Sequence, residues 1–463
     1  MDNFQRLRPV GRLEQYSTAR HNLKFYYNVA AAATYTLPKS FTLPAKDYIY
    51  KACEALISQH PSLSAIPVGE ETKEPYFVRL PEIDLDQPIS FQERQHETSE
   101  AELEQDLDLE SLLRIQHNTG FTPPSPFWRL CILTEKSNEK RFTAAFVYHH
   151  AIGDGSSGKS FHLTFLQALH AASSLAPGEA KRTVRSPETP LLPNLEEVHP
   201  LPVSLFYLLN AAFRAKIWSS KDPGLWTGSE IQTPLVTQVR HFALPKDTTS
   251  SLKTLCREKG TTITALIETI TARAFFHNLP QTYTSLKCCC AISTRRWLPD
   301  PITDDSIGVW VEDFDEYYKR DTVNTAQFPW TETQRSRKNI EAALALKGKN
   351  ASPNLLRYVK DYHQELFLSQ VGKPRAVSYE VSNIGIVGVD QVRDENKPAL
   401  GRLVFSQSAN VVGGAVMVSV ATGGDGCLVV AFTWQTGVVE DQLMEAVVGG
   451  AKEELCELAS GTE

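Results

Sequence analysis

Apolar and β-branched residues gather in short runs along the chain, and these runs alternate with stretches of helical periodicity. The clearest run is Arg141–Tyr148 (RFTAAFVY), which predicts a buried strand. Glycines then flank Asp154 and free the backbone for a tight loop, after which Phe161, Phe165 and Leu169 recur at the spacing of one helix face. The pattern therefore predicts a strand, a tight loop and a helix, in this order.

The rest of the chain shows the same mixture of patterns. Helices are predicted at residues 45–59, 248–258, 262–276 and 440–459, and strands at residues 127–135, 239–244, 283–293, 376–387, 402–412 and 427–435. The turn SNEK joins the strand at 127–135 to the strand at 141–148 and predicts a hairpin. Because helices and strands do not alternate strictly, the fold class we expect is α+β.

A proline-rich stretch divides the chain. Its 463 residues exceed what one ordinary core requires and suit two domains of about 200 residues each. Residues 173–202 contain six prolines and few periodic apolar positions, as linkers do. We therefore expect an N-terminal lobe over residues 1–180, a linker or crossover over residues 181–235, and a C-terminal lobe over residues 236–463.

The most apolar segment is Pro202–Trp218, which ends in basic residues. No stretch of 18 or more apolar residues occurs, so the sequence predicts no transmembrane helix. The segment is compatible with peripheral contact to a membrane surface and also with packing on the crossover between the lobes. We favour packing, because aromatic stripes at helical spacing are more often buried in the protein.

Composition narrows the class of protein. A net charge of -7 without a basic stripe argues against a nucleic-acid partner. The eight cysteines lack the spacing of zinc or disulfide frameworks, and the consecutive Cys288–Cys290 cannot all pair, so we expect reduced thiols and a cytoplasmic location. The N-terminus lacks the apolar core of a signal peptide. We expect a monomer.

His150 and Asp154 are the candidate catalytic residues. An imidazole has a reference pKa near neutrality and can accept a proton from a hydroxyl, so His150 is a candidate general base. Asp154 could orient this imidazole or turn away and pin the loop through an arginine, and the spacing leaves both open. The alternative for His149 and His150 is that both are ordinary strand-end histidines satisfied by backbone groups.

We expect neither a nucleophilic serine nor a phosphate loop. The sequence has no G-x-S-x-G motif, and we expect Ser156 and Ser157 to cap the following helix. The stretch Gly153–Ser160 (GDGSSGKS) has the G-x-x-x-x-G-K-[ST] spacing of a phosphate loop, but we do not expect it to act as one.

The string HHAIGDG (His149–Gly155) resembles the HHxxxDG motif of the chloramphenicol-acetyltransferase-like superfamily, which includes plant BAHD acyltransferases, condensation domains and fungal alcohol O-acetyltransferases. The plant motif DFGWG does not occur, which favours the fungal family. Further segments similar to that family extend over the whole chain: Gly11–His21, His60–Gly69, Gly260–Ile267, Ser293–Asp300, Ile307–Val311 and Val381–Gly385.

The resemblance implies two chloramphenicol-acetyltransferase-like lobes with a tunnel and the active site at their interface. It makes His150 the general base, with His149 and Gly155 as supporting residues of the motif. It also pairs Asp154 with an arginine of the other lobe.

Two further segments are implied in this site. Arg295 and Arg296 are the candidate partners of Asp154; they would face opposite ways in an extended segment, and we favour Arg295. Ser382 and Asn383 are candidate substrate-binding residues that could donate to the oxyanion or to the pantetheine arm, although a plain turn is an alternative for them.

The function predicted on this basis is an acyl-CoA-dependent O-acyltransferase, acting by direct attack of a small or secondary-metabolite alcohol on the thioester. Acetyl-CoA is the expected co-substrate, and this chemistry requires no metal and no bound cofactor. One alternative is a condensation-type enzyme that takes its acyl group from a carrier protein. Another is a catalytically silent binding protein with the same fold.

Overall fold

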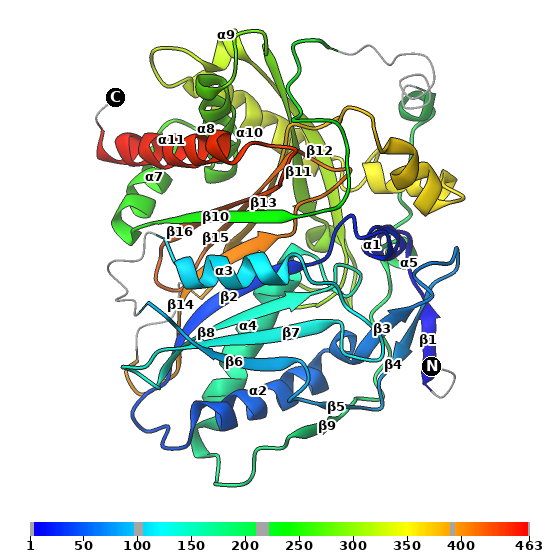
Figure 1. The fold of residues 1–463 in the computed structure, drawn as a ribbon, viewed down its shortest axis with the longest axis vertical. Coiled ribbons are helices and arrows are strands. Elements are labelled where there is room, and N and C mark those ends of the chain that lie inside the picture. The colour runs from blue at the N-terminus through cyan, green and yellow to red at the C-terminus, as the bar shows by residue number, and fades with distance from the viewer. Residues whose placement is uncertain (1–3, 97–104, 210–221, 389–393, 462–463) are drawn as a thin grey trace.

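The computed structural model describes residues 4–96, 105–209, 222–388 and 394–461, and folds them into two lobes of mixed sheet and helix (Figure 1). The lobe drawn mainly in blue and cyan is built on a five-stranded sheet of order β14-β2-β8-β7-β6. Helices α2 and α4 pack together beside this sheet. The bounds are β2 Val29–Thr36, α2 Ala45–Gln59, β6 Ile89–Glu93, β7 Trp128–Thr134, β8 Arg141–Tyr148, α4 Gly155–Ala171 and β14 Ala399–Gln407.

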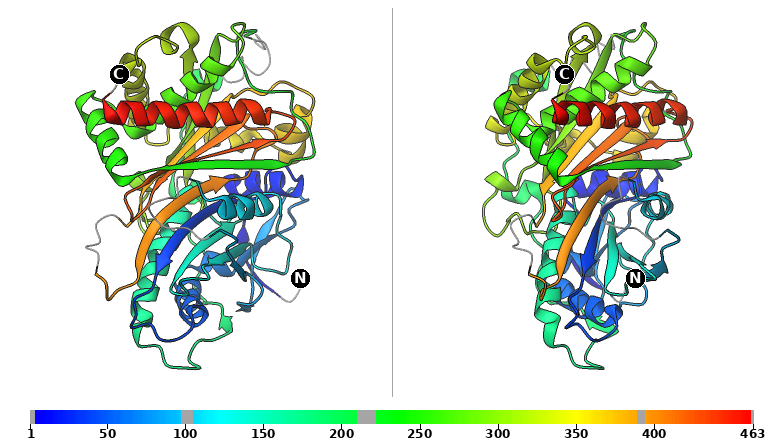
Figure 2. Two further views of the ribbon diagram at one scale, coloured as in Figure 1. Left: turned by 60° about the vertical axis from the view of Figure 1, so that its left-hand side comes forward. Right: turned by 90° about the vertical axis from the view of Figure 1, so that its left-hand side faces the viewer.

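The other lobe is built on a six-stranded sheet of order β10-β16-β15-β13-β11-β12. Helices α7, α8, α10 and α11 cover it, and α11 runs along the outside of the lobe (Figure 2). The bounds are β10 Thr237–Leu244, α7 Lys246–Glu258, α8 Ile263–Asn278, β11 Ser285–Ser293, β12 Val311–Lys319, α9 Arg320–Val323, α10 Trp330–Ala345, β13 Tyr379–Ile386, β15 Val416–Thr422, β16 Leu428–Gln435 and α11 Asp441–Ser460.

Smaller elements complete the first lobe and the crossover. A three-stranded sheet has the order β1-β4-β3, and β5 pairs with β9. Helix α1 lies at the junction of the lobes, above the first sheet (Figure 1). The bounds are β1 Gln5–Pro9, α1 Arg12–Asn22, β3 Ala65–Val68, β4 Tyr76–Arg79, β5 Glu82–Asp84, α3 Leu107–Gln116, β9 Thr183–Arg185 and α5 Leu195–Val198.

Strand β14 ties the two lobes together. Although it follows most of the second lobe in sequence, it pairs antiparallel with β2 over the register Ala399↔Thr36 to Gln407↔Val29. It also packs against β15 and β16 of the second sheet. The first sheet is therefore completed by a strand from the C-terminal part of the chain.

The first lobe's core is unusually tight where α4 crosses β2. Strand β2 is a run of buried alanines, and a Cβ placed on Gly158 of α4 would come within 2.8 Å of the Cβ of Ala31. Small residues on both elements therefore bring the helix against the sheet. The alanines lack the β-branched signal of a strand, which is why the sequence pattern did not predict β2.

The apolar segment that was predicted to pack on the crossover carries exposed side chains. A helical turn at residues 205–209 leaves Leu205 71% and Phe206 81% exposed, so the predicted packing of this segment is wrong for these residues. Residues 210–218 of the same segment lie outside the described part of the chain. Among the described residues, no helix is both long and apolar enough to cross a membrane.

Candidate active site

A cavity of about 300 Å³ lies between the two lobes. Its wall takes residues from α1, from the loop before α4, from β14, and from strands β11 to β13 of the second lobe. The residues that carry polar groups into its lining include Ser17, Arg20, His150, Asp154, Cys289, Glu312, Asp313, Ser352, Glu380, Ser382, Gln407 and Asn410. The cavity is therefore lined from both lobes, with the end of β8 at its wall.

His150 enters this cavity at the end of β8, where the strand gives way to the loop. Its Nδ1 is buried without a hydrogen-bond partner on any other described residue, so Nε2 is the nitrogen with access to the cavity. The ring lies 5.7 Å from the ring of Tyr26. Burial, together with the positive charge of Arg20, lowers the pKa of His150 to about 3. The imidazole is thus neutral and able to accept a proton.

Asp154 points away from His150 and binds the second lobe. Arg295 donates two hydrogen bonds to its carboxylate, of 2.7 and 2.9 Å, and each of the two residues is only 3% exposed. The backbone N–H of Trp310 donates to the same carboxylate at 3.0 Å. The sequence left two roles open for Asp154. The structure shows the second role, in which the carboxylate holds the loop in place through an arginine.

The same carboxylate also caps helix α4. Asp154 accepts a hydrogen bond from the backbone N–H of Ser157, whose hydroxyl lies 3.2 Å from the backbone nitrogen of Asp154, so the two form a capping box. Asp154 is therefore the N-cap residue. The prediction that Ser156 and Ser157 cap the helix is wrong for Ser156, and Ser157 takes part only as the partner of Asp154 in the capping box.

Gly155 allows the loop to approach its neighbours closely. A Cβ at this position would lie 3.0 Å from the ring of Phe405 on β14 and 3.1 Å from Ile384 on β13. Gly153 is crowded in the same way by Ser157 and Tyr148. A side chain at either position would therefore require its neighbours or the loop that carries His150 to shift.

The remaining predicted residues separate into two groups. Arg296 is exposed, because residues 295–297 form a short 3₁₀ turn rather than an extended segment. Ser382 lines the cavity, whereas the side chain of Asn383 turns to α8 and donates to Thr264 at 3.0 Å. Adjacent residues of a strand face opposite ways, so of this pair β13 presents only Ser382 to the cavity.

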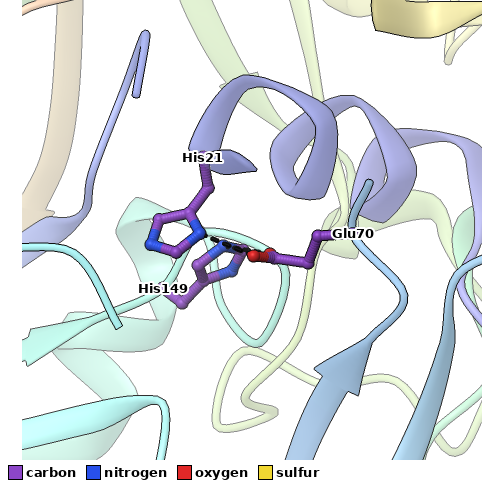
Figure 3. Close-up of side chains that lie close together, drawn as sticks. All are labelled: His21, Glu70 and His149. Carbon is purple, nitrogen blue, oxygen red and sulfur yellow. Dashed lines mark hydrogen bonds and ion pairs between the residues drawn. The ribbon is translucent and has the colours of Figure 1, made fainter. Parts of the chain in front are cut away.

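His149 does not line the cavity and instead lies close to His21 and Glu70 (Figure 3). Its Nε2 lies 3.1 Å from one oxygen of Glu70, and Nδ1 of His21 lies 2.8 Å from the other. Burial alone would raise the pKa of Glu70, but its interactions with the two histidines lower that pKa to about 2. An ionised carboxylate thus joins α1 to the residue that follows β8 and precedes His150.

The hydrogen bonds of this cluster exclude a metal ion between the three side chains. Nε2 of His21 accepts from the backbone N–H of Phe121, and Nδ1 of His149 accepts from that of Ala151. The nitrogens that face Glu70 therefore carry the protons, whereas a metal ligand must offer a lone pair. Among the described residues this is the one group with metal-ligand geometry, and its donors do not fit a metal.

The second lobe lines the cavity with carboxyl groups that the sequence pattern did not single out. Burial raises the pKa of Glu312 to about 7 and also raises the pKa values of Asp313 and Glu380. On the opposite wall, Arg20 of α1 is 6% exposed. The sequence pattern did not indicate that these carboxyl groups and Arg20 are buried, because single charged residues within a helix or strand pattern usually face solvent.

Comparison with known proteins relates this chain to alcohol acetyltransferases. Residues 9–460 match the family model of alcohol acetyltransferases. A protein of Aspergillus fumigatus described as probable alcohol acetyltransferase crmB is 36% identical over 462 residues, covering 95% of this chain and 97% of the relative. The probable alcohol acetyltransferase FCK4 of Fusarium pseudograminearum is 25% identical over 475 residues, covering 95% and 93%.

Solved structures share the two-lobed architecture. The trichothecene 15-O-acetyltransferase TRI3 of Fusarium sporotrichioides superposes with a TM-score of 0.71 at 13% identity, covering 97% of this chain and 94% of its own. The first condensation domain of the calcium-dependent antibiotic synthetase gives a TM-score of 0.63, also at 13% identity, covering 98% and 96%. These likenesses confirm the predicted two-lobed α+β fold.

Proposed function

The chain belongs to the alcohol acetyltransferase family, and from that premise we propose that it transfers an acetyl group from acetyl-CoA directly to the hydroxyl of a small or secondary-metabolite alcohol. The observation that carries this proposal is the setting of His150. Its imidazole is neutral and makes no hydrogen bond with any described hydroxyl or thiol, so its Nε2 is available to an acceptor bound in the cavity.

The proposed reaction uses one base. The alcohol hydroxyl donates to Nε2 of His150, and its oxygen attacks the thioester carbonyl carbon as the proton moves to the ring. The tetrahedral intermediate then collapses, the carbon–sulfur bond breaks, and the leaving thiolate takes the proton back from the imidazolium. Because the pKa of His150 is low, the imidazolium is a strong acid and returns its proton readily.

An acyl-enzyme is disfavoured by the thiols and hydroxyls of the cavity. Burial and the neighbouring Asp313 raise the pKa of Cys289 well above its usual value, so its thiolate, the nucleophilic form, is scarce. Ser382 also reaches the cavity but has no hydrogen bond to His150, so nothing described activates its hydroxyl. We assign Ser382 instead to hydrogen bonding with the bound thioester.

The Asp154–Arg295 pair and Gly155 position the base without touching the reacting atoms. Asp154 caps α4 and accepts from the backbone N–H of Trp310, and Arg295 donates to the carbonyl of Ser306, so the loop after His150 is held from both lobes. Positioning of this kind matters because a displacement of about 1 Å at the reacting group can cost roughly 10² in rate.

The test is steady-state kinetics with acetyl-CoA and a panel of alcohols, with release of the CoA thiol as the readout. Direct transfer requires both substrates in the cavity together, so initial-rate plots at several alcohol concentrations should intersect. Parallel lines, or an acetyl adduct on a serine or cysteine found by mass spectrometry, would contradict direct attack. Turnover only with a carrier-bound acyl group, and none with acetyl-CoA, would contradict the proposed donor.

A further inference from the structure

Arg20 is a buried cation without a hydrogen-bond or ion-pair partner among the described residues. It is the one lysine or arginine among the described residues that line the cavity with His150, and its exposure is only 6%. Its Nε is buried without a hydrogen bond, and no described residue accepts a hydrogen bond from its terminal nitrogens or pairs with it as an ion. These terminal nitrogens have the access to the cavity that Nε lacks.

The surroundings of Arg20 hold the guanidinium without neutralising it. Its central carbon lies 3.8 Å from the ring centre of Tyr26 and 4.9 Å from that of Tyr16. Aromatic faces attract a cation, but they leave the five N–H donors of a guanidinium unused. The ring of Tyr26 lies in turn 5.7 Å from the ring of His150, so the same aromatic side chain contacts the cation and neighbours the base.

The carboxyl groups on the facing wall do not serve as its counter-ion. Glu380 accepts a hydrogen bond of 2.6 Å from the backbone N–H of Gly414, and Asp313 is 3.4 Å from the thiol of Cys289. Neither carboxylate lies within ion-pair distance of Arg20, and burial raises the pKa values of both toward the neutral form. Burying a guanidinium without a hydrogen-bonded counter-ion is unfavourable, so its retention beside the base favours a bound ligand as the partner.

We propose that the guanidinium of Arg20 binds a negatively charged oxygen of the substrates in the His150 cavity. This inference rests on the proposed acyl transfer for the identity of that oxygen. Two sources share this chemistry: the thioester oxygen, which becomes an oxyanion in the tetrahedral intermediate, and a carboxylate carried by the acceptor alcohol. The planar guanidinium presents a fork of N–H donors that suits either of these negatively charged oxygens.

A binding experiment tests the site without any turnover. Acetate is a carboxylate small enough for the cavity, so the unfolding midpoint of the wild type should rise saturably with sodium acetate, compared with sodium chloride at equal ionic strength. Arg20→Met, which retains an apolar stem against the two tyrosine rings, should lose this response. An equal response in both proteins would overturn the proposal.

Stability separates this role from a structural one. Because Arg20 has no partner, Arg20→Met should unfold at the same or a higher temperature than the wild type. Arg295→Met is the matched control, since it removes an arginine of similar burial that is bound to Asp154, and its midpoint should fall clearly. A fall in Arg20→Met as large as that of the control would overturn the proposal, because Arg20 would then be structural.

Kinetics distinguish the two sources of the oxygen. We would compare a neutral acceptor with its carboxylate counterpart, starting with butan-1-ol and 4-hydroxybutanoate. If Arg20 binds the oxyanion, Arg20→Met should lower kcat for both by roughly 10² to 10³, with partial recovery in Arg20→Lys. If it binds an acceptor carboxylate, only kcat/KM for 4-hydroxybutanoate should fall.

Turnover of both acceptors within twofold of the wild type would overturn the proposal. If the wild type itself released no thiol from acetyl-CoA, the proposed function would fail, whereas the acetate titration would still decide whether Arg20 binds a negative oxygen.

Discussion

His150 combines a neutral imidazole with one ring nitrogen, Nε2, that is accessible from the cavity. Burial is the main reason that its pKa lies near 3, and the charge of Arg20 acts in the same direction. Nδ1 is enclosed in the protein, so chemistry at this ring is confined to Nε2. At the scale of single residues, the site therefore offers one proton acceptor in one direction.

Replacing His150 should separate catalysis from stability. We expect His150→Ala to lower kcat by roughly 10² or more, because the proton acceptor is lost, while the thermal midpoint changes little, because the ring makes no hydrogen bond to another described residue. Thiol release and a thermal melt on the same preparation would check both. Near-normal turnover in this variant would refute the role of His150 as the base.

The rate should also be insensitive to mild acid. A general base acts in its neutral form, and a pKa of about 3 leaves His150 neutral throughout the range from pH 5 to 8. We therefore expect kcat/KM in this range to show no acid limb from this group, with circular dichroism confirming that the protein stays folded. A tenfold loss for each pH unit below about 6.5 would mean that the base has an ordinary histidine pKa.

Glu70 provides a third test at this scale. Glu70→Gln replaces one acceptor oxygen with an NH2 group that faces an imidazole N–H, so one hydrogen bond to His149 or His21 becomes a clash of donors. We expect the free energy of unfolding to fall by about 1–3 kcal/mol. The neighbouring exposed Glu71 offers the control, because Glu71→Gln should stay within about 0.5 kcal/mol of the wild type. Equal stability of the two variants would argue against the cluster.

At the scale of elements, the unit of the site is strand β8, the loop after it and helix α4. Asp154 begins the helix and binds Arg295 of the second lobe, so one side chain joins local capping to the contact between lobes. Gly155 then brings the helix start against β13 and β14. The loop is therefore held from three directions, and His150 is carried with it.

A double-mutant cycle would measure this arrangement. Asp154→Leu leaves Arg295 buried without its partner and should cost about 3–5 kcal/mol of unfolding free energy. Asp154→Leu combined with Arg295→Met should cost less than the sum of the two single changes, because no charge is then stranded. Denaturant titrations of the four proteins provide the data. Additive effects would show that the two side chains act independently.

At the scale of the whole molecule, buried neutral histidines connect the parts of the fold. His117 lies between Asn28 at the start of β2 and Ser406 of β14, at 2.6 and 2.8 Å. Burial lowers the pKa of His117 to about 3 and the pKa values of His149 and His162 to about 4. The junction that β14 makes with the first sheet thus depends on an uncharged imidazole.

These histidines predict loss of stability in acid. Between about pH 6.5 and pH 4 the unfolded chain binds protons that the folded protein excludes, so the free energy of unfolding falls as the pH falls, by about 1.4 kcal/mol per pH unit for each such histidine. His117→Gln keeps a donor and an acceptor but does not titrate. Its pH dependence in chemical denaturation should be shallower by about that amount, and an unchanged slope would show that His117 is not responsible.

Much of the site's local structure could be predicted from the sequence. The strand at residues 141–148, the loop and the following helix form where the pattern places them, because each depends on neighbours in the chain. The motif His149–Gly155 and the similar segments around it also identify the family, because residue types and spacing are properties of the sequence alone.

Other features depended on the tertiary structure. Residues 399–407 complete a sheet that begins with β2, more than 350 residues earlier in the chain, and no local pattern encodes that partner. The burial of Arg20, the contacts of Glu70 and the orientation of the Asn383 side chain toward α8 likewise depend on how the elements pack together. Short-range preferences select strands and helices, but only packing decides which side chains share a cavity and which charges are left there without a partner.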